Sequence, residues 1–215
     1  LASALAASTD EQGNFDIHRW GREGMNNLTP LWLLKYLPNM LACHVTIIHD
    51  AQGPSNTITC GEASSGLSIG ESLRVIQRGA ADLCFCGGTE SKLNLMAYLR
   101  QQFTGRLTTD GEADPTGAVR PFDQQAHGTV VGEGGGIVTL EASESFEQRA
   151  ERDGARAYAA LAGFGASQSV NREAGNLEPE PTGRGISVAI KSAMREAGVE
   201  ASEIDTIAGD AIAAN

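Results

Sequence analysis

The apolar positions of the chain alternate between a helical spacing and short β-prone runs. The helical spacing is clearest over 67–76 and over 186–197, where Gly198 provides the stop. Further helices are predicted over 1–7, from the cap Thr29 to the stop Pro38, and over 41–49, 92–103 and 141–151. Strands are predicted over 56–60, 81–86, 137–140 and 158–166. Strands that alternate with helices predict an α/β fold.

Two of the connections are long. Residues 104–119 show no apolar period and predict a loop that is either a functional cover or a mobile surface segment. Residues 171–181 predict a second, polar loop. No internal repeat is visible in the sequence.

The charge balance is acidic, with 27 Asp and Glu residues against 16 Lys and Arg residues. This argues against a nucleic-acid partner, which needs a basic footprint. An acidic partner would need a local basic patch, and the candidates are Arg19, Arg22, Arg74 and Arg78. The alternative is that these four are scattered surface charges.

Apolar runs and cysteine usage favour a protein of the cytoplasm. No run approaches the roughly 20 apolar residues of a membrane helix, and no signal segment opens the chain. The four cysteines lack the density of a disulfide framework, so free, buried thiols are expected; Cys84 and Cys86 are spaced to share one face of a strand. His44 and His127 have no spacing typical of a metal site, so no metal is expected.

The stretch from Gly53 to Gly70 reads as strand, sharp turn and helix. Gly61 allows a tight bend, and Ser64 and Ser65 are residue types that begin helices. Such a turn directs one side chain toward the free N–H groups and the positive end of the helix dipole. It is therefore a suitable seat for a nucleophile or an anion.

Several motifs occur in the order and near the spacing of one known family. They are Asn39-Met40-x-Ala42, Gly53-Pro54-Ser55, Gly87-Gly88-Thr89-Glu90, Arg120-Pro121-Phe122-Asp123, and Gly132-Glu133-Gly134-Gly135-Gly136 through Leu140-Glu141. Together they resemble the β-ketoacyl synthases of the thiolase superfamily. The resemblance implies a layered αβαβα fold, with residues 1–150 forming most of the N-terminal half and residues 151–215 the start of the C-terminal half.

The resemblance also indicates where this chain departs from the family. The position of the nucleophilic cysteine is Glu62, and Cys60 could replace it only with a two-residue slip. The position of the first catalytic histidine is Asp210, and an active-site aromatic is Thr129, within Ala126-His127-Gly128-Thr129. Trp32 falls near the acyl pocket of the partner subunit by resemblance, or is ordinary core.

These departures favour a catalytically silent, non-condensing subunit similar to the chain-length factors of the family. The run Gly61-Glu62-Ala63-Ser64-Ser65-Gly66 is similar in style to theirs. Such a subunit would form a homodimer or a heterodimer with an active ketosynthase, pairing through the 56–60 strand, and would shape the acyl pocket. Acyl carrier protein would be a further partner, its phosphopantetheine arm carrying the substrate, with no other cofactor. The alternatives are an active ketosynthase with an unusual site and a scaffold of thiolase fold without an acyl substrate.

Overall fold

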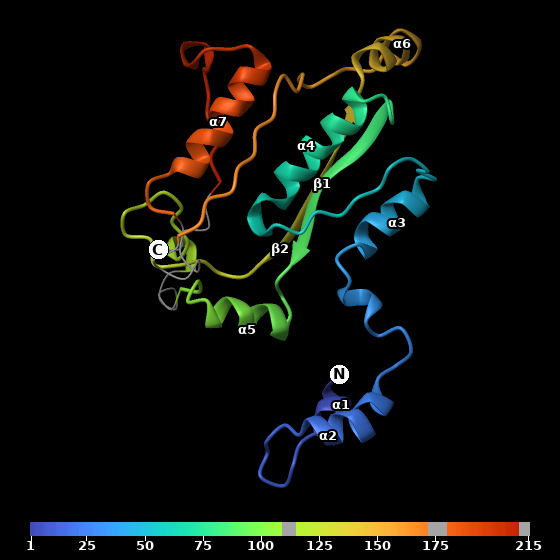
Figure 1. Cartoon of the computed structure of the whole chain (residues 1–215), viewed down its shortest axis with the longest axis vertical. Coiled ribbons are helices and arrows are strands. Elements are labelled where there is room, and N and C mark those ends of the chain that lie inside the picture. Colours follow the sequence, from blue (N-terminus) through green and yellow to red (C-terminus); the bar gives the residue numbers. More distant parts are fainter. Residues whose placement is uncertain (109–114, 172–179, 211–215) are drawn as a thin grey trace. The chain divides into compact units, whose positions relative to one another are not determined.

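The computed structural model describes residues 1–108, 115–171 and 180–210. The chain divides into two compact units, residues 1–59 and 60–215, and each unit is considered by itself. The predicted loops at 104–119 and 171–181 lie partly outside the described residues. Figure 1 shows the course of the chain and the labels of its elements.

The first unit is made of short helices. They are α1 (Ala2–Ala7), α2 (Ile17–Arg19), the π-helix η1 (Trp20–Gly24), the 3₁₀ helices η2 (Met25–Asn27) and η3 (Leu34–Tyr36), and α3 (Met40–Ile48). Helix α1 packs against η1 through small residues: Ala4 and Ser8 are fully buried, and a Cβ on Gly24 would overlap the Ser8 hydroxyl oxygen. Helices α1 and α3 agree with the prediction from sequence.

The helix predicted from Thr29 to Pro38 is wrong. Residues 30–33 form turns, and only η3 is helical in this stretch. Leu31 has a φ of 62°, which an α-helix cannot include. The Thr-Pro pair therefore begins a turn here, and the second proline lies after a single 3₁₀ turn.

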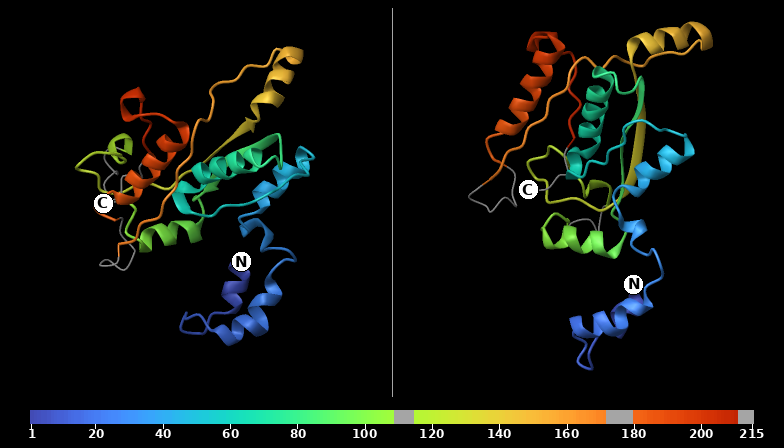
Figure 2. Two further views of the ribbon diagram at one scale, coloured as in Figure 1. Left: turned by 45° about the horizontal axis from the view of Figure 1, so that its top comes forward. Right: turned by 45° about the vertical axis from the view of Figure 1, so that its right-hand side comes forward.

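The second unit is built on a two-stranded antiparallel sheet covered by one long helix. Strand β1 (Leu83–Ser91) pairs with β2 (Glu133–Glu141), with Cys86 opposite Val138. Helix α4 (Ser64–Gln77) lies along this sheet, as Figures 1 and 2 show. Both strands are longer than the sequence predicts, because their glycines continue the strands.

Glycines in β1 allow α4 to approach closely. A Cβ on Gly88 would lie 2.8 Å from the Ser65 Cβ. The Ser68 hydroxyl lies 2.7 Å from the Gly87 carbonyl oxygen and accepts a hydrogen bond from the Gly87 N–H at 2.9 Å. The predicted end of this strand at residue 86 is wrong, since Gly87 and Gly88 continue it and form its contact with the helix.

Only one face of β1 is buried. Cys86 is 4% exposed, whereas Leu83 and Phe85, on the opposite face, are about 40% exposed (41% and 39%). Burial raises the pKa of both the Cys84 and the Cys86 thiols. A continuous apolar run such as 83–86 is typical of a strand buried on both faces, but here the face that carries Leu83 and Phe85 is exposed.

The helices that follow the strands are close to the predicted ranges. Helix α5 (Leu95–Phe103) begins at Asn94, whose side-chain oxygen accepts from the Ala97 N–H at 2.9 Å. Helix α6 (Ser143–Asp153) follows β2, and Arg149 forms a two-pronged ion pair with Glu141. The 3₁₀ helix η5 (Pro115–Gly117) lies between α5 and β2.

Helix α7 (Arg184–Ala197) ends at Gly198, whose φ of 69° confirms the predicted glycine stop. The 3₁₀ helix η6 (Ala201–Glu203) follows it. Residues 158–166 form no strand; instead this segment passes between α4 and α7 (Figure 1). The strand predicted there is wrong. Residues 56–60 form no strand within this chain, and their predicted pairing with a partner subunit stays a prediction.

Three residues hold this segment between the two helices. Cβ atoms on Gly163 and Gly165 would overlap carbonyl oxygens of α7, and the Phe164 ring contacts Gly70 of α4. Arg74 of α4 also donates two hydrogen bonds to Glu196 of α7, at 2.5 and 2.6 Å. This segment is therefore held by close glycine contacts with α7 and by the Phe164 ring against α4, and not by the hydrogen bonds of a strand.

Candidate functional site

The turn before α4 is confirmed as the sharp bend that the sequence predicts. Gly61 has a φ of 58°, and residues Gly61–Ala63 form the 3₁₀ helix η4 that leads directly into α4. The Ser64 hydroxyl accepts a hydrogen bond from the Cys60 N–H at 2.8 Å and donates one to the Gly61 carbonyl at 2.7 Å. These two bonds fix the backbone on both sides of Glu62.

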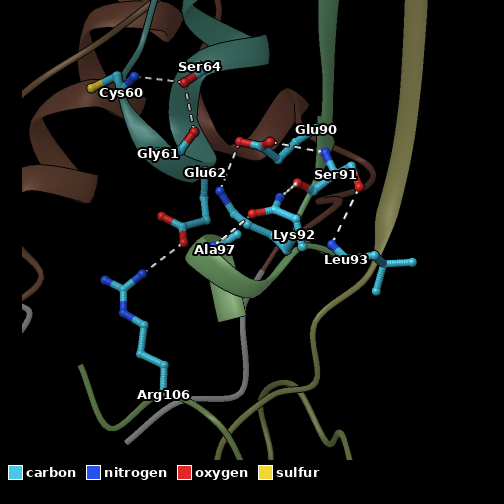
Figure 3. Close-up of polar contacts among 11 residues, drawn as sticks. Cys60, Gly61, Glu62, Ser64, Glu90, Ser91, Lys92, Leu93, Ala97 and Arg106 are labelled. Carbon is cyan, nitrogen blue, oxygen red and sulfur yellow. Dashed lines mark hydrogen bonds and ion pairs between the residues drawn. The ribbon is translucent and has the colours of Figure 1, made fainter. Parts of the chain in front are cut away.

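Glu62 points toward a guanidinium group. Its Oε1 accepts a hydrogen bond from Arg106 Nη1 at 3.0 Å, as Figure 3 shows. The Glu62 side chain is 52% exposed and the Arg106 side chain 37%. Within the described part of the chain, Arg106 is the hydrogen-bond partner of the Glu62 carboxylate.

Arg106 lies beyond α5 and is held by the backbone of residues 128–129. Its carbonyl oxygen accepts from the Thr129 N–H at 2.8 Å, and the Thr108 N–H donates to the Thr129 carbonyl at 2.9 Å. A Cβ on Gly128, where φ is 129°, would lie 2.8 Å from both the Arg106 oxygen and the Thr108 nitrogen. Thr129 is therefore connected to Glu62 through Arg106.

The end of β1 contributes a second ion pair in the region that Figure 3 shows. Lys92 Nζ lies 2.8 Å from Glu90 Oε2, and the Ser91 hydroxyl donates to Glu133 Oε2 at 2.9 Å. Both pairs are solvated. The surroundings of Glu62 are thus polar and partly exposed to water.

Cys60 lies at the start of the same turn but faces elsewhere. Its thiol is free and exposed, and its sulfur points away from the Glu62 carboxylate (Figure 3). The four cysteines are free as predicted, but Cys86 alone is buried, so the expectation of buried thiols is wrong for Cys60.

Among the described residues, no hydrogen bond or ion pair joins Asp210 to Glu62. Asp210 is exposed, and Gly209 before it lies beneath the Phe122 ring, since a Cβ there would be 2.8 Å from that ring. Residues 121–125 line an open hollow of about 540 Å³. Trp32 belongs to the first unit, where it is half-buried and packs edge-on against Tyr36.

Three of the four arginines considered for a basic patch have acidic partners. Arg19 lies 4.0 Å from Asp16, Arg78 lies 3.5 Å from Glu71, and Arg74 pairs with Glu196. The patch hypothesis is weakened, because these arginines are largely neutralised locally.

Within the described ranges, no three His, Cys, Asp or Glu side chains gather in a group that could hold a metal ion. Nor does any helix of those ranges combine the length and apolar character that crossing a bilayer requires.

Sequence reasoning missed Arg106. It lies 44 residues from Glu62, inside the loop predicted at 104–119. The one feature of the sequence that points to such a partner is the Glu62 carboxylate, whose negative charge a lysine or arginine can pair with. The sequence contains 16 such cations, and nothing in their spacing selects this one.

The helix-covered sheet and the strand-adjacent turn define a thiolase-like ketosynthase fold. A solved β-ketoacyl synthase from Burkholderia phymatum STM815 matches 94% of this chain and 45% of its own chain, with a TM-score of 0.70 and 25% identity. "The ishigamide ketosynthase/chain length factor" matches 83% of this chain and 40% of its own, with a TM-score of 0.63 and 28% identity.

The chain belongs to the β-ketoacyl synthase family, because the sequence profile "Beta-ketoacyl synthase, N-terminal domain" matches residues 4–145. The mitochondrial 3-oxoacyl-[acyl-carrier-protein] synthase of Arabidopsis thaliana is 34% identical over 183 residues, which are 85% of this chain and 38% of that protein. This chain therefore spans less than half the length of that relative. Family membership confirms the predicted α/β, thiolase-like class.

Proposed function

We propose that the protein is a ketosynthase-like subunit of fatty acid or polyketide biosynthesis that does not itself condense acyl groups. The observation that carries the proposal is the Glu62–Arg106 ion pair, formed by the residue at which the family resemblance implies a cysteine. A carboxylate bonded to a guanidinium cannot store an acyl group as a thioester. An acyl transfer to it would give a mixed anhydride, which water cleaves readily.

The other departures support the same proposal. Asp210 stands where the resemblance implies a catalytic histidine, and a carboxylate cannot donate the hydrogen bond that a neutral imidazole donates at neutral pH. Loss of one catalytic group commonly costs several powers of ten in rate. Two such losses leave little condensing activity.

The subunit would pair with an active ketosynthase and shape its acyl pocket, with Trp32 and Thr129 as candidate lining residues. Acyl carrier protein would deliver the acyl group on its phosphopantetheine arm, and the complex would work in the cytoplasm. The likeness to a ketosynthase/chain length factor at 28% identity supports a pairing of this kind.

Condensation assays test the proposal. The full-length protein alone is expected to give no β-ketoacyl product from acyl and malonyl carrier-protein thioesters, whereas the pair with its homologue gives product. Exchange of Trp32→Ala or Thr129→Phe in the paired complex should shift product chain length. Condensation by the protein alone, retained in Glu62→Ala, would overturn it.

A second candidate is an active ketosynthase that uses Cys60. The observation that favours it is that this thiol is free, exposed and two residues from the family position. Condensation by the protein alone that is lost in Cys60→Ala would establish this alternative.

A further inference from the structure

Two departures from the family pattern are physically connected. One is Glu62 in the turn before α4, and the other is the run 126–129 before β2. The link between them is Arg106, whose side chain contacts Glu62 and whose carbonyl is bonded to the Thr129 N–H. Residues far apart in the sequence thus meet at one arginine.

The backbone around Arg106 leaves little room for displacement. Arg106 and Thr108 flank Thr129 as a short parallel bridge centred on Leu107. Gly128 approaches so closely that any Cβ would overlap the Arg106 carbonyl oxygen and the Thr108 nitrogen, at 2.8 Å from each. A residue with a side chain at position 128 would therefore push Arg106 from its place.

We infer that Arg106 is a positioning residue: seated by Gly128 and Thr129, it fixes the direction of the side chain at position 62 and supplies a standing positive charge there. The inference rests on the proposed function, since it explains how a carboxylate is accommodated where the family carries a thiol. Arg106 acts through its positive charge and by orienting the side chain at position 62, and it takes no part in making covalent bonds.

A thiol placed at position 62 would report this charge. In Glu62→Cys, on a Cys60→Ala background, the midpoint of the iodoacetamide rate–pH profile should lie below that of the same variant carrying Arg106→Gln. One unit charge at roughly 5 Å in nearly aqueous surroundings raises the thiolate fraction at pH 7 about fourfold. About 1 M salt should remove most of the difference, because the Debye length is then about 3 Å.

Matched variants separate charge from structure. Arg106→Lys should retain most of the effect, whereas Arg78→Gln, which breaks an ion pair of similar exposure elsewhere, should leave the profile unchanged. Gly128→Ala should abolish the effect although Arg106 is still present. Thermal melts establish that each variant is folded. If Gly128→Ala is not folded, the comparison with and without Arg106→Gln still tests the role of Arg106.

The inference is overturned if the profiles measured with and without the Arg106→Gln substitution coincide at low salt. This outcome is distinguishable from failure of the proposed function. Acyl loading of Cys60 in the native protein would refute the silent subunit and leave the thiol profiles intact. Coincident profiles would refute the role of Arg106 and leave the loading result unchanged.

Discussion

Two alanine substitutions on one helix should change stability in opposite directions. Gly66 and Gly70 lie four residues apart on α4 and gain the same methyl group in Gly66→Ala and Gly70→Ala. A Cβ on Gly66 meets nothing within 4 Å, whereas one on Gly70 would overlap three atoms of the Phe164 ring. The contrast tests whether residues 158–166 are truly wedged between α4 and α7.

The magnitudes follow from helix propensity and packing. Replacing an exposed helical glycine by alanine gains up to about 1 kcal/mol, so Gly66→Ala should stabilise the protein by roughly that amount. At Gly70 the same gain opposes an overpacking cost of about 1–3 kcal/mol. Phe164 has little freedom to withdraw, since Gly163 and Gly165 on either side already touch α7. The cost should therefore lie in the upper part of its range, at about 2–3 kcal/mol, which leaves a net loss of about 1–2 kcal/mol in Gly70→Ala.

Urea unfolding of the full-length protein and its variants measures both values. Adding Phe164→Leu, which shortens the ring side chain, should recover part of the loss in Gly70→Ala, as a double-mutant cycle would record. Equal stabilisation by the two alanine substitutions would refute the wedged segment.

Further predictions concern the contacts around α4. Arg74 lowers the pKa of the Glu196 carboxyl to about 2, below its ordinary value of 4.5. The stabilisation by this ion pair is therefore complete above about pH 4.5 and is lost as the pH falls toward 2. Urea melts should show the free energy of unfolding falling over this pH range, and Glu196→Gln should remove the part of the fall that this carboxyl causes. Ser68→Ala should cost about 1–3 kcal/mol in thermal or urea melts, because the N–H and carbonyl of Gly87 lose a shared partner. Cys86, whose pKa burial raises, should resist thiol reagents until the protein unfolds, and labelling at the native rate would contradict this.

Local signals predicted most helices and the turn, the helix expected from Thr29 to Pro38 being the exception. The apolar stripe over 186–197 and its glycine stop correspond to α7, and Gly61 marks the bend before α4. These features depend on residues within one or two turns of each other, so the sequence alone carries them.

Strand predictions failed where long-range pairing decides the outcome. Residues 158–166 have the alternation of a strand, yet their glycines and Phe164 fit between two helices. Conversely, the predicted strands stop at 86 and begin at 137, but Gly87 and Gly88 continue β1 and Gly134, Gly135 and Gly136 belong to β2. The strand propensity of a residue does not indicate which part of the chain packs against its backbone.

The site shows the same limit. Motif spacing selected Glu62, Cys60 and Thr129 as candidates, but the partner of the carboxylate comes from the loop after α5. A single arginine in a loop carries no periodic signal. Its role follows only from the geometry of the turn and of the bridge at Leu107 and Thr129.

The most direct test of the silent-subunit account is the mass of the full-length protein after incubation with an acyl carrier protein thioester. The account predicts an unchanged mass in the native protein and in Cys60→Ala, with an active ketosynthase as the positive control for loading. A mass increase equal to one acyl group, mapped by peptide sequencing to Cys60 and absent from Cys60→Ala, would contradict it.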